Sequence, residues 1–406
     1  MATKRAQLAS PSPAVQTANY NRPIGYLRAF IVALVVAHHA ALAYYPTPLL
    51  PPHSLARQPR WWQAFPVVDA HKWSGFSRFV GFNDVFFMSL MFFLSGLFVC
   101  HGLAKKGTAS FLRDRLLRLG LPFVVAAAIL APLAYYPTYL QIAGHSGLAG
   151  FWRQWLAIGQ WPAGPAWFIW VLLTFDCLAA VVWIRARRAV EAFAETASRV
   201  GRKPGAFFAA LVFISALAYI PMALHFTSLA WTAFGPFSFQ TSRILHYFCY
   251  FLIGAGVGLG GVDNGLLALD GKLARRWLLW VAAAVAGFIA ATAITLFALI
   301  SGSQALGLQI AMHAGFVLSC AASCLAFLAL FLRFAGARSP LKDSLAANSY
   351  GIYLLHYPFV SWLQYALLAA SLPAVVKAAI VLAGALALSW ASAAAMRTIP
   401  AVKRVV

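Results

Sequence analysis

The chain has 406 residues, of which 62% are hydrophobic and 10% are charged. A soluble protein carries about 25% charged residues, so this composition excludes a soluble enzyme, a secreted disulfide scaffold and a disordered chain. The formal net charge of +22 comes from 31 Lys and Arg residues against 9 Asp and Glu residues. In a soluble protein this excess would suggest nucleic-acid binding, so the placement of the basic residues has to be considered.

Apolar runs long enough to cross a bilayer recur from residue 29 to residue 394. About 20 such residues span the hydrocarbon core as a helix, which satisfies its own backbone hydrogen bonds in lipid. The sequence therefore predicts an all-α, polytopic integral membrane protein with about ten transmembrane helices. We place them at residues 26–46, 83–103, 120–139, 166–184, 207–224, 243–262, 277–299, 309–332, 348–370 and 373–395. They form one membrane domain, 26–396, between a polar tail, 1–25, and a short tail, 397–406.

Basic residues are distributed unevenly between the two sides of these spans. One side, including both tails, holds 23 Lys and Arg residues, the other side holds 7, and Arg28 lies within the first span. The positive-inside rule places the side with 23 in the cytoplasm. The basic excess is thus mainly a topology signal with some contact to anionic lipids, and we expect no nucleic-acid partner. We expect a multi-pass protein of the cytoplasmic (inner) membrane with both termini in the cytoplasm.

Ionisable residues within a span cost about 2.5–3.5 kcal/mol each on insertion scales and suggest function by default. Arg28 and His39 are the most informative pair, because 11 residues at about 100° each return to within roughly 20° of one helix face, about 16 Å further along. A cation near the cytoplasmic boundary with a titratable base deeper on the same face suits a long anionic ligand. In the alternative, Arg28 reaches lipid phosphates and His39 bonds a neighbouring helix. His38 points about 100° away and is expected to be structural.

Other polar residues allow two interpretations each. His356 lies among Ser, Tyr and Gly residues in the ninth span, and suits either a polar cavity or helix packing. Asn83 and Asp84 stand at the expected start of the second span and could cap it as easily as bind a ligand. Asp176 lies deep in the fourth span and needs a partner, for which Arg243, His246 or a bound proton are candidates.

The five cysteines all fall in apolar spans, where small apolar packing is their expected role. Their odd number argues against a disulfide framework. Cys320 and Cys324 share a helix face without nearby His or acidic partners, so we expect no metal site.

Five stretches carry recognisable combinations of residues in chain order. They are Arg28 followed after ten residues by His39, the run 92–96 (Phe-Phe-Leu-Ser-Gly), the basic run 111–122 with Arg115 and Arg118, the pair Trp167-Phe168, and the run 349–358 with Tyr353, His356 and Pro358. Together they resemble the motifs of membrane-bound acyltransferase family 3, which includes the glucan-biosynthesis protein C branch. The resemblance covers residues 27–358, most of the chain.

The resemblance implies an O-acyltransferase that transfers groups other than amino-acyl groups. Its donor substrate would be cytoplasmic acyl-CoA, carrying an acetyl or a succinyl group, and its acceptor a hydroxyl of an extracytoplasmic glycan or glycolipid. No bound cofactor is expected. The catalytic residues would be His39, as general base, and Arg28, since a neutral His is suited to removing a hydroxyl proton. Substrate-binding residues would be Arg115, Arg118, Ser95, Trp167, Tyr353 and His356.

Two alternatives remain at this stage. Arg115 and Arg118 could hold coenzyme A phosphates, or they could be part of the topology signal alone. The protein itself could be a transporter or flippase that uses the same intramembrane polar residues as a substrate path, or a sensor or scaffold. We find no internal repeat and no symmetric pair of broken spans, which disfavours an inverted-repeat transporter.

The charge distribution predicts that both termini and residues 104–119 are cytoplasmic, whereas 47–82 and 140–165 lie outside. Single cysteines at positions 60 and 153 should therefore react with an impermeant thiol reagent added to intact cells, and a cysteine at position 110 should not. The opposite labelling pattern would refute this topology.

Overall fold

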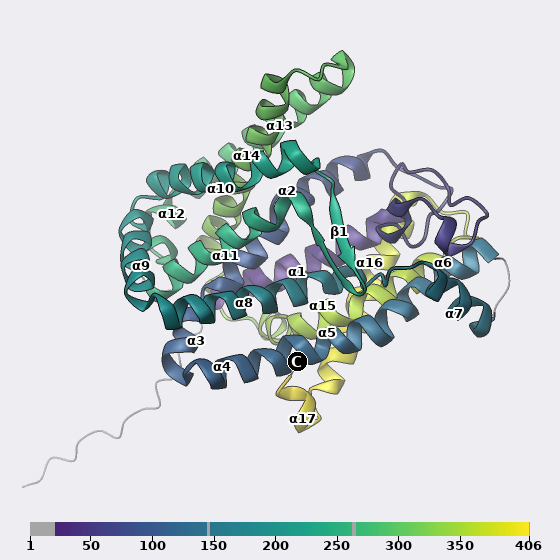
Figure 1. Cartoon of the computed structure of the whole chain (residues 1–406), viewed down its shortest axis with the longest axis horizontal. Coiled ribbons are helices and arrows are strands. Elements are labelled where there is room, and N and C mark those ends of the chain that lie inside the picture. The colour runs from purple at the N-terminus through teal and green to yellow at the C-terminus, as the bar shows by residue number, and fades with distance from the viewer. Residues whose placement is uncertain (1–20, 144–146, 262–264, 406) are drawn as a thin grey trace, which may run out of the picture.

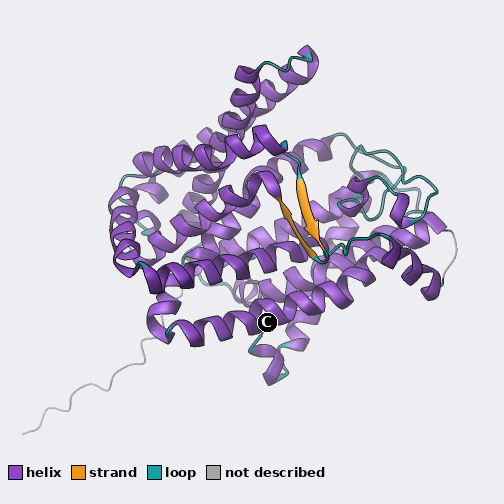
Figure 2. Ribbon diagram, in the orientation of Figure 1, coloured by secondary structure: helices purple, strands orange, loops and turns teal. Residues whose placement is uncertain are grey.

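A computed structural model describes residues 21–143, 147–261 and 265–405 of the chain. Helices make up most of this part, and its strands form one small hairpin (Figures 1 and 2). The helices are α1 (Arg22–Leu42), α2 (Gly75–Gly96), α3 (Val99–Lys106), α4 (Thr108–Arg115), α5 (Leu121–Val125), α6 (Ala131–Ala143), α7 (Leu148–Ala157), α8 (Trp167–Arg185), α9 (Arg187–Gly201), α10 (Pro204–Phe226), α11 (Ile244–Leu259), α12 (Lys272–Arg275), α13 (Trp277–Ser301), α14 (Leu306–Phe334), α15 (Pro340–Ala366), α16 (Ala374–Met396) and α17 (Pro400–Lys403). The strands are β1 (Trp231–Phe234) and β2 (Phe237–Gln240), which pair antiparallel.

The predicted all-α membrane fold is confirmed. Within the described residues, nine helical segments are long and apolar enough to cross a membrane, and they correspond to nine of the ten predicted spans. The remaining predicted span, 348–370, corresponds to α15, which has 27 residues. A helix of this length extends about 40 Å. It is less apolar because Asn348, Ser349, His356 and Gln364 lie along it, and all four are buried against the protein.

The predicted N-terminal tail, 1–25, lies largely outside the described residues. Helix α1 begins at Arg22, where the side chain of Asn21 accepts a hydrogen bond from the backbone N–H of Ile24. Pro23 occupies the first turn, where a missing N–H costs nothing. The first span therefore starts a few residues earlier than predicted.

The predicted start of the second span, and the capping role of Asn83 and Asp84, are wrong. Helix α2 begins at Gly75 and passes through Asp84, whose carboxylate lies 2.7 Å from the guanidinium of Arg243. Arg243 also donates to the backbone carbonyl of Asp84. Because this ion pair compensates the charge, an acidic residue is accommodated inside the span and does not mark its end.

The expected loop before the third span is helical as well. Residues 108–143 form one segment, interrupted by π-helical turns at 116–120 (η3) and 126–130 (η4). Pro122, Pro132 and Pro137 lie in this segment, and irregular turns relieve the loss of backbone hydrogen bonds that proline causes. The unpredicted elements include the amphipathic helix α9, between the fourth and fifth spans, the short helices α7, α12 and α17, and the β1–β2 hairpin.

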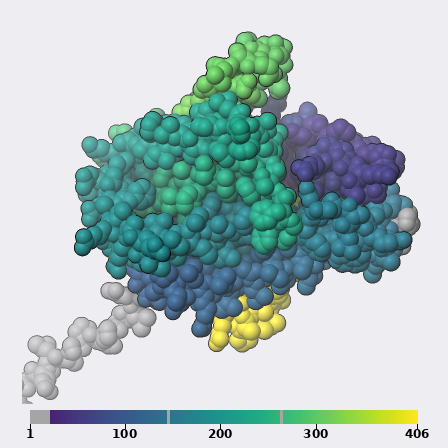
Figure 3. Space-filling view, viewed as in Figure 1, coloured from purple at the N-terminus to yellow at the C-terminus, as the bar shows by residue number. Residues whose placement is uncertain are grey.

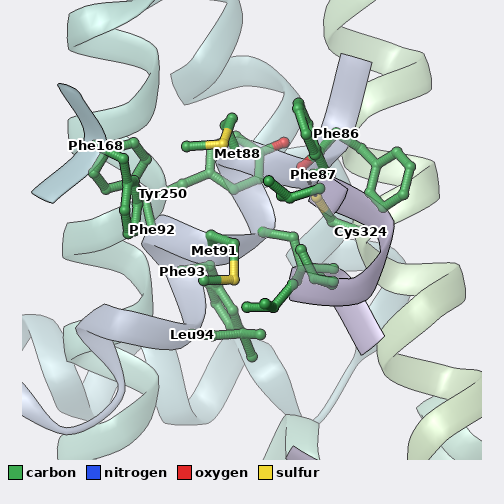
Figure 4. Packing of buried hydrophobic residues seen from close by; sticks show 14 of the residues in the cluster. Phe86, Phe87, Met88, Met91, Phe92, Phe93, Leu94, Phe168, Tyr250 and Cys324 are labelled. Atoms are coloured by element: carbon green, nitrogen blue, oxygen red, sulfur yellow. Dashed lines mark hydrogen bonds between the residues drawn. The ribbon is translucent and has the colours of Figure 1, made fainter. Parts of the chain in front are cut away.

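The Phe-Phe-Leu-Ser-Gly run packs in the core of the bundle. Phe92 of α2 contacts the ring of Phe168 on α8 (Figure 4). Phe92 also contacts the ring of Tyr247 on α11. At Gly254 and Gly258 of α11, a Cβ atom would collide with a backbone carbonyl of α2 and with that of Leu97, just after α2. At Gly96 of α2, a Cβ atom would likewise collide with a backbone carbonyl of α11. Glycine thus lets these two helices approach each other closely, as small residues do in membrane bundles.

Helices α1 and α15 run parallel through the bundle. Near their starts, the Tyr26 hydroxyl donates to Asp343 Oδ1 at 2.5 Å, and near their ends the Gln364 amide donates to the Ala40 carbonyl at 3.2 Å. We call the end at which these two helices begin the basic end, because Arg22, Lys342 and Arg397 lie there, and the other the opposite end. The connected ends of α13 and α14 project from the body of the molecule (Figures 1 and 3), and several apolar side chains near this connection are exposed.

A buried ion pair fixes the loop between α1 and α2 at the opposite end. The ammonium of Lys377, at the start of α16, lies 2.7 Å from Asp69 Oδ2, and the side chains are 0% and 1% exposed. The backbone N–H of Asp69 donates to the Ala43 carbonyl, just past the end of α1. His71 also contacts Asp69, at 3.1 Å. The pair thus joins α1, the loop and α16.

Replacing Lys377 with Met should destabilise the protein strongly, because it leaves the Asp69 carboxylate buried without its partner. Breaking such a pair costs about 3–5 kcal/mol. Thermal unfolding in detergent is the measurement. The matched control is Lys106→Met, which breaks the half-exposed pair between Lys106 and Asp114 and should leave the melting temperature nearly unchanged. Equal effects of the two substitutions would contradict this account.

Candidate functional site

His39 lies three residues from the end of α1 and is partly buried between α1 and α15. Its Nδ1 atom is 2.8 Å from the carbonyl of Val35, one turn earlier on the same helix. The same Nδ1 atom is 3.2 Å from Nε2 of His356 on α15. The backbone carbonyl of His39 accepts a hydrogen bond from Gln364. The structure thus holds this side chain and its backbone at a fixed place between the two helices.

The partners of the two rings determine where their protons lie. Nδ1 of His356 is 2.6 Å from the Tyr353 carbonyl, which can only accept, so the neutral ring carries its proton on Nδ1 and Nε2 is an acceptor. Nδ1 of His39 then faces two acceptors, the Val35 carbonyl and His356 Nε2, and must carry a proton. The Nε2 atom of neutral His39 therefore bears a lone pair, and the described residues offer it no hydrogen-bond partner. This arrangement presents a ring nitrogen that can take up a proton.

Aromatic residues and a small cavity adjoin the pair. The ring of Tyr357 lies 5.2 Å from that of His39. Tyr357 and Tyr353 line a cavity of about 20 Å³ together with residues of α8 and of the π-turn η4. A cavity of this size has room for about one water molecule. The Tyr353 hydroxyl donates to the Pro165 carbonyl, so Tyr353 borders the cavity and, through its own carbonyl, positions His356.

His38 lies on a different side of α1. Its ring stacks on Phe87 of α2 at 5.2 Å, and it makes an angle of 73° with the ring of His39. Its Nδ1 atom is buried with no hydrogen-bond partner among the described residues. The predicted divergence of the two histidines is thus present in the structure, and His39 is the one that meets α15.

Arg28 lies at the basic end of α1, exposed, and makes no ion pair with any described residue. It is 11 residues before His39, which is about 16 Å along the helix axis. Because α1 and α15 run parallel and Tyr26 meets Asp343, Arg28 lies at about the height of residue 345. It therefore stands near the mouth of the α1–α15 contact and not beside the histidine pair.

Arg115 provides the partner of Asp176. Its Nε atom lies 3.2 Å from the carboxylate of Asp176, which is 1% exposed, and its guanidinium stacks on Phe111. The predicted partners of Asp176, Arg243 and His246, are thus not the ones found. The sequence did not indicate this pair because residues 108–115 were expected to form a loop, whereas α4 brings them alongside α8. The charge of Arg115 is largely compensated within the protein.

Arg118 lies in the π-turn η3 at the basic end, with an exposed side chain. Its Nε atom donates to the backbone carbonyl of Arg404, just after α17, at 3.2 Å. Its own carbonyl accepts a hydrogen bond from the Tyr350 hydroxyl of α15 at 2.5 Å. Arg118 thus connects η3, α15 and the C-terminal segment.

Ser95 and Trp167 lie elsewhere in the bundle. The Ser95 hydroxyl donates to the Met91 carbonyl of its own helix. Trp167 packs against Phe92, Tyr247 and Trp231. Neither makes a hydrogen bond or ring contact with the histidine pair in the described part of the chain. Their predicted role in substrate binding stays a prediction.

A second pocket, which was not predicted from the sequence, lies at the basic end. This pocket has a volume of about 270 Å³ and is lined by Ser344, Ala347, Asn348, Ala394, Arg397, Thr398 and Lys403. In the sequence, the only indication of this pocket was the pair of basic residues Arg397 and Lys403 beyond the last span. The positive-inside rule already accounted for both of them. The described residues contain no group of three or more His, Cys, Asp or Glu side chains that could hold a metal ion.

The model of the family Acyl_transf_3, described as an acyltransferase domain, matches residues 22–394. This match covers most of the chain and includes every element that forms the histidine pair. The chain therefore belongs to acyltransferase family 3, as the sequence motifs predicted. No curated protein and no solved structure gives a significant match.

The geometry predicts that neutral His39 is protonated on Nδ1 and not on Nε2. Nitrogen-15 NMR of histidine-labelled protein at pH 8 should show this tautomer, with the His39 signals identified by their loss in His39→Ala. His38→Ala is the control and should leave these signals in place. A proton on Nε2 of His39 would contradict the inferred arrangement.

Proposed function

We propose that this member of acyltransferase family 3 transfers an acyl group, acetyl or succinyl, from cytoplasmic acyl-CoA to a hydroxyl of an extracytoplasmic glycan or glycolipid. The observation that supports this proposal is the free Nε2 atom of His39, whose ring is oriented by the Val35 carbonyl and His356. An acyl transfer to a hydroxyl needs a group that removes the hydroxyl proton, and a neutral His is suited to it.

In the proposed reaction, Nε2 of His39 takes the proton of the acceptor hydroxyl while the hydroxyl oxygen attacks the thioester carbonyl. The new carbon–oxygen bond forms, the carbon–sulfur bond breaks, and the coenzyme A sulfur leaves and takes the proton from His39. The Nδ1–H of His39 remains bonded to His356 and the Val35 carbonyl throughout. His356 is thus a positioning residue, which fixes the tautomer of the base.

The position of His39 in α1 supports the proposal that the two substrates approach it from opposite sides. From the rise per residue of an α-helix, it lies about 25 Å from the start of α1. Only three residues separate it from the end of that helix. If the basic end faces the cytoplasm, as the charge distribution predicts, the thioester must reach deep into the bundle while the acceptor approaches over a short distance. Arg28, free of ion pairs among the described residues, is placed to meet an anionic donor at the entrance.

A transporter or flippase would use the polar residues differently, because it would carry a substrate without breaking a thioester. Purified protein incubated with acyl-CoA and candidate glycans should release coenzyme A only when an acceptor hydroxyl is present. Mass analysis of cell-envelope glycans with and without the protein should identify the acylated product. Loss of an intact glycan from one side of a vesicle, without coenzyme A release, would instead indicate transport.

His39→Ala should reduce acyl transfer at least about a hundredfold, the lower end of what general-base catalysis contributes. Donor binding should persist, because other groups hold the coenzyme A. The measurement is coenzyme A release by purified protein that matches the wild type in thermal stability.

His38→Ala is the matched control, since its ring packs on α2 and lies outside the pair. It should lose much less activity. Nearly normal transfer by His39→Ala, with an inactive His38→Ala, would show that the assigned base is wrong. Normal transfer by both variants would refute the mechanism.

A further inference from the structure

The pocket at the basic end is formed by α15, α16 and α17. Ser344, Ala347 and Asn348 come from the first turns of α15, Ala394, Arg397 and Thr398 from the end of α16, and Lys403 from α17. Arg118 connects the segments next to this pocket. Its side chain donates a hydrogen bond to the Arg404 carbonyl, and its own backbone carbonyl accepts one from the Tyr350 hydroxyl. The pocket has a volume of about 270 Å³. The pocket is open to the molecular surface and is not an enclosed cavity.

Asn348 is a buried polar residue whose side chain is only partly paired. Its side chain is 7% exposed, and its Nδ2 atom donates to the Ser344 carbonyl at 2.8 Å. Ser344 is held in turn by Trp390, whose indole N–H donates to the Ser344 hydroxyl. The Oδ1 atom of Asn348 is buried with no hydrogen-bond partner among the described residues. Such an atom costs free energy unless a ligand or water donates to it.

Two cations also line the pocket. Arg397 and Lys403 make no ion pair with any described residue, and the lining contains no acidic side chain. The pocket therefore offers two positive charges to an anion and one fixed acceptor to a hydrogen-bond donor. A lone inorganic anion would use the charges, but it would leave Asn348 Oδ1 unpaired.

Asn348 of the pocket and His356 of the histidine pair lie on the same helix, α15. Asn348 and His356 are eight residues apart on α15, which is about 12 Å along the helix. Eight residues turn the helix by about 800°, which is two full turns and about 80° more. The two side chains therefore point in directions about 80° apart around the helix axis. A ligand bound at Asn348 by one end could extend along α15 towards the cavity lined by Tyr353 and Tyr357, beside the histidine pair.

We propose that this pocket binds the phosphate-bearing nucleotide end of the acyl donor. Arg397 and Lys403 bind the phosphates, and Asn348 Oδ1 accepts a hydrogen bond from an N–H or O–H of the nucleotide. The linear arm of the donor then runs along α15 and carries the thioester to His39. This inference rests on the proposed function, since it assumes that coenzyme A carries the acyl group.

An anionic lipid headgroup at this end of the bundle would present the same phosphate group to the pocket. A lipid would satisfy Arg397 and Lys403, but its function would be structural and independent of the donor. The two sources differ in a measurable way, because only the nucleotide site should discriminate between donors that carry or lack a nucleotide.

The experiment compares Arg397→Gln/Lys403→Gln with the wild type, using acetyl-CoA and acetyl-pantetheine as donors. Charge-assisted hydrogen bonds are the strong ones, so the double variant should raise the KM for acetyl-CoA more than tenfold and leave the KM for acetyl-pantetheine unchanged. Asn348→Ala should raise the KM for acetyl-CoA alone in the same way. The charge-matched control is Arg275→Gln/Arg276→Gln, which removes two exposed cations outside the pocket and should change neither constant.

Equilibrium binding of adenosine 3′,5′-bisphosphate, measured by calorimetry, tests the pocket without any acyl transfer. Wild-type protein should bind it, and the double variant should bind it more than tenfold more weakly. Unchanged binding in the double variant would overturn the pocket assignment even if acyl transfer is observed. Binding without transfer to any hydroxyl would refute the proposed function and retain the nucleotide site.

The lipid source is tested in nanodiscs of phosphatidylcholine with and without phosphatidylglycerol. If the pocket is a nucleotide site, the double substitution should reduce the affinity for acetyl-CoA equally in both kinds of nanodisc. An effect of the double substitution that occurs only with phosphatidylglycerol, and equally for both donors, would assign the pocket to lipid and overturn the proposal.

Discussion

The contact between α1 and α15 is the interaction on which the candidate site depends. A single N–H group, Nδ1–H of His39, is shared between a carbonyl of its own helix and a ring nitrogen of the other. Because His356 is itself bonded to the Tyr353 carbonyl, neither neutral ring can reverse its tautomer without losing a hydrogen bond. Buried polar groups that are fully satisfied in this way favour one arrangement, and here that arrangement leaves one nitrogen free.

The other charges in the bundle are mostly neutralised in pairs. Asp84 binds Arg243, Asp176 lies against Arg115, and Asp69 binds Lys377. Each pair joins segments distant in the chain, and each compensates a charge that would be costly in lipid. Arg28, Arg397 and Lys403 at the basic end make no ion pair with any described residue, and Arg397 and Lys403 also line the pocket there.

The sequence predicted the fold class and the approximate positions of the nine candidate spans and of α15, because long apolar runs have few alternatives in lipid. It also predicted that His39, and not His38, shares a face with Arg28, since this follows from helix geometry alone. The contact with His356 could not be derived in this way, because it depends on how α15 packs on α1. The pairing of Arg115 with Asp176 was missed for a related reason: helix α4 extends through a stretch whose polarity suggested a loop.

The central claim is that one histidine connects a donor at the basic end with an acceptor at the opposite end. Proteoliposomes of known orientation test it most directly, with acyl-CoA added outside and an oligosaccharide acceptor enclosed inside. Molecules whose basic end faces outward should acylate the enclosed acceptor, and His39→Ala should abolish this transfer. Acylation only when donor and acceptor are on the same side of the membrane would contradict the account.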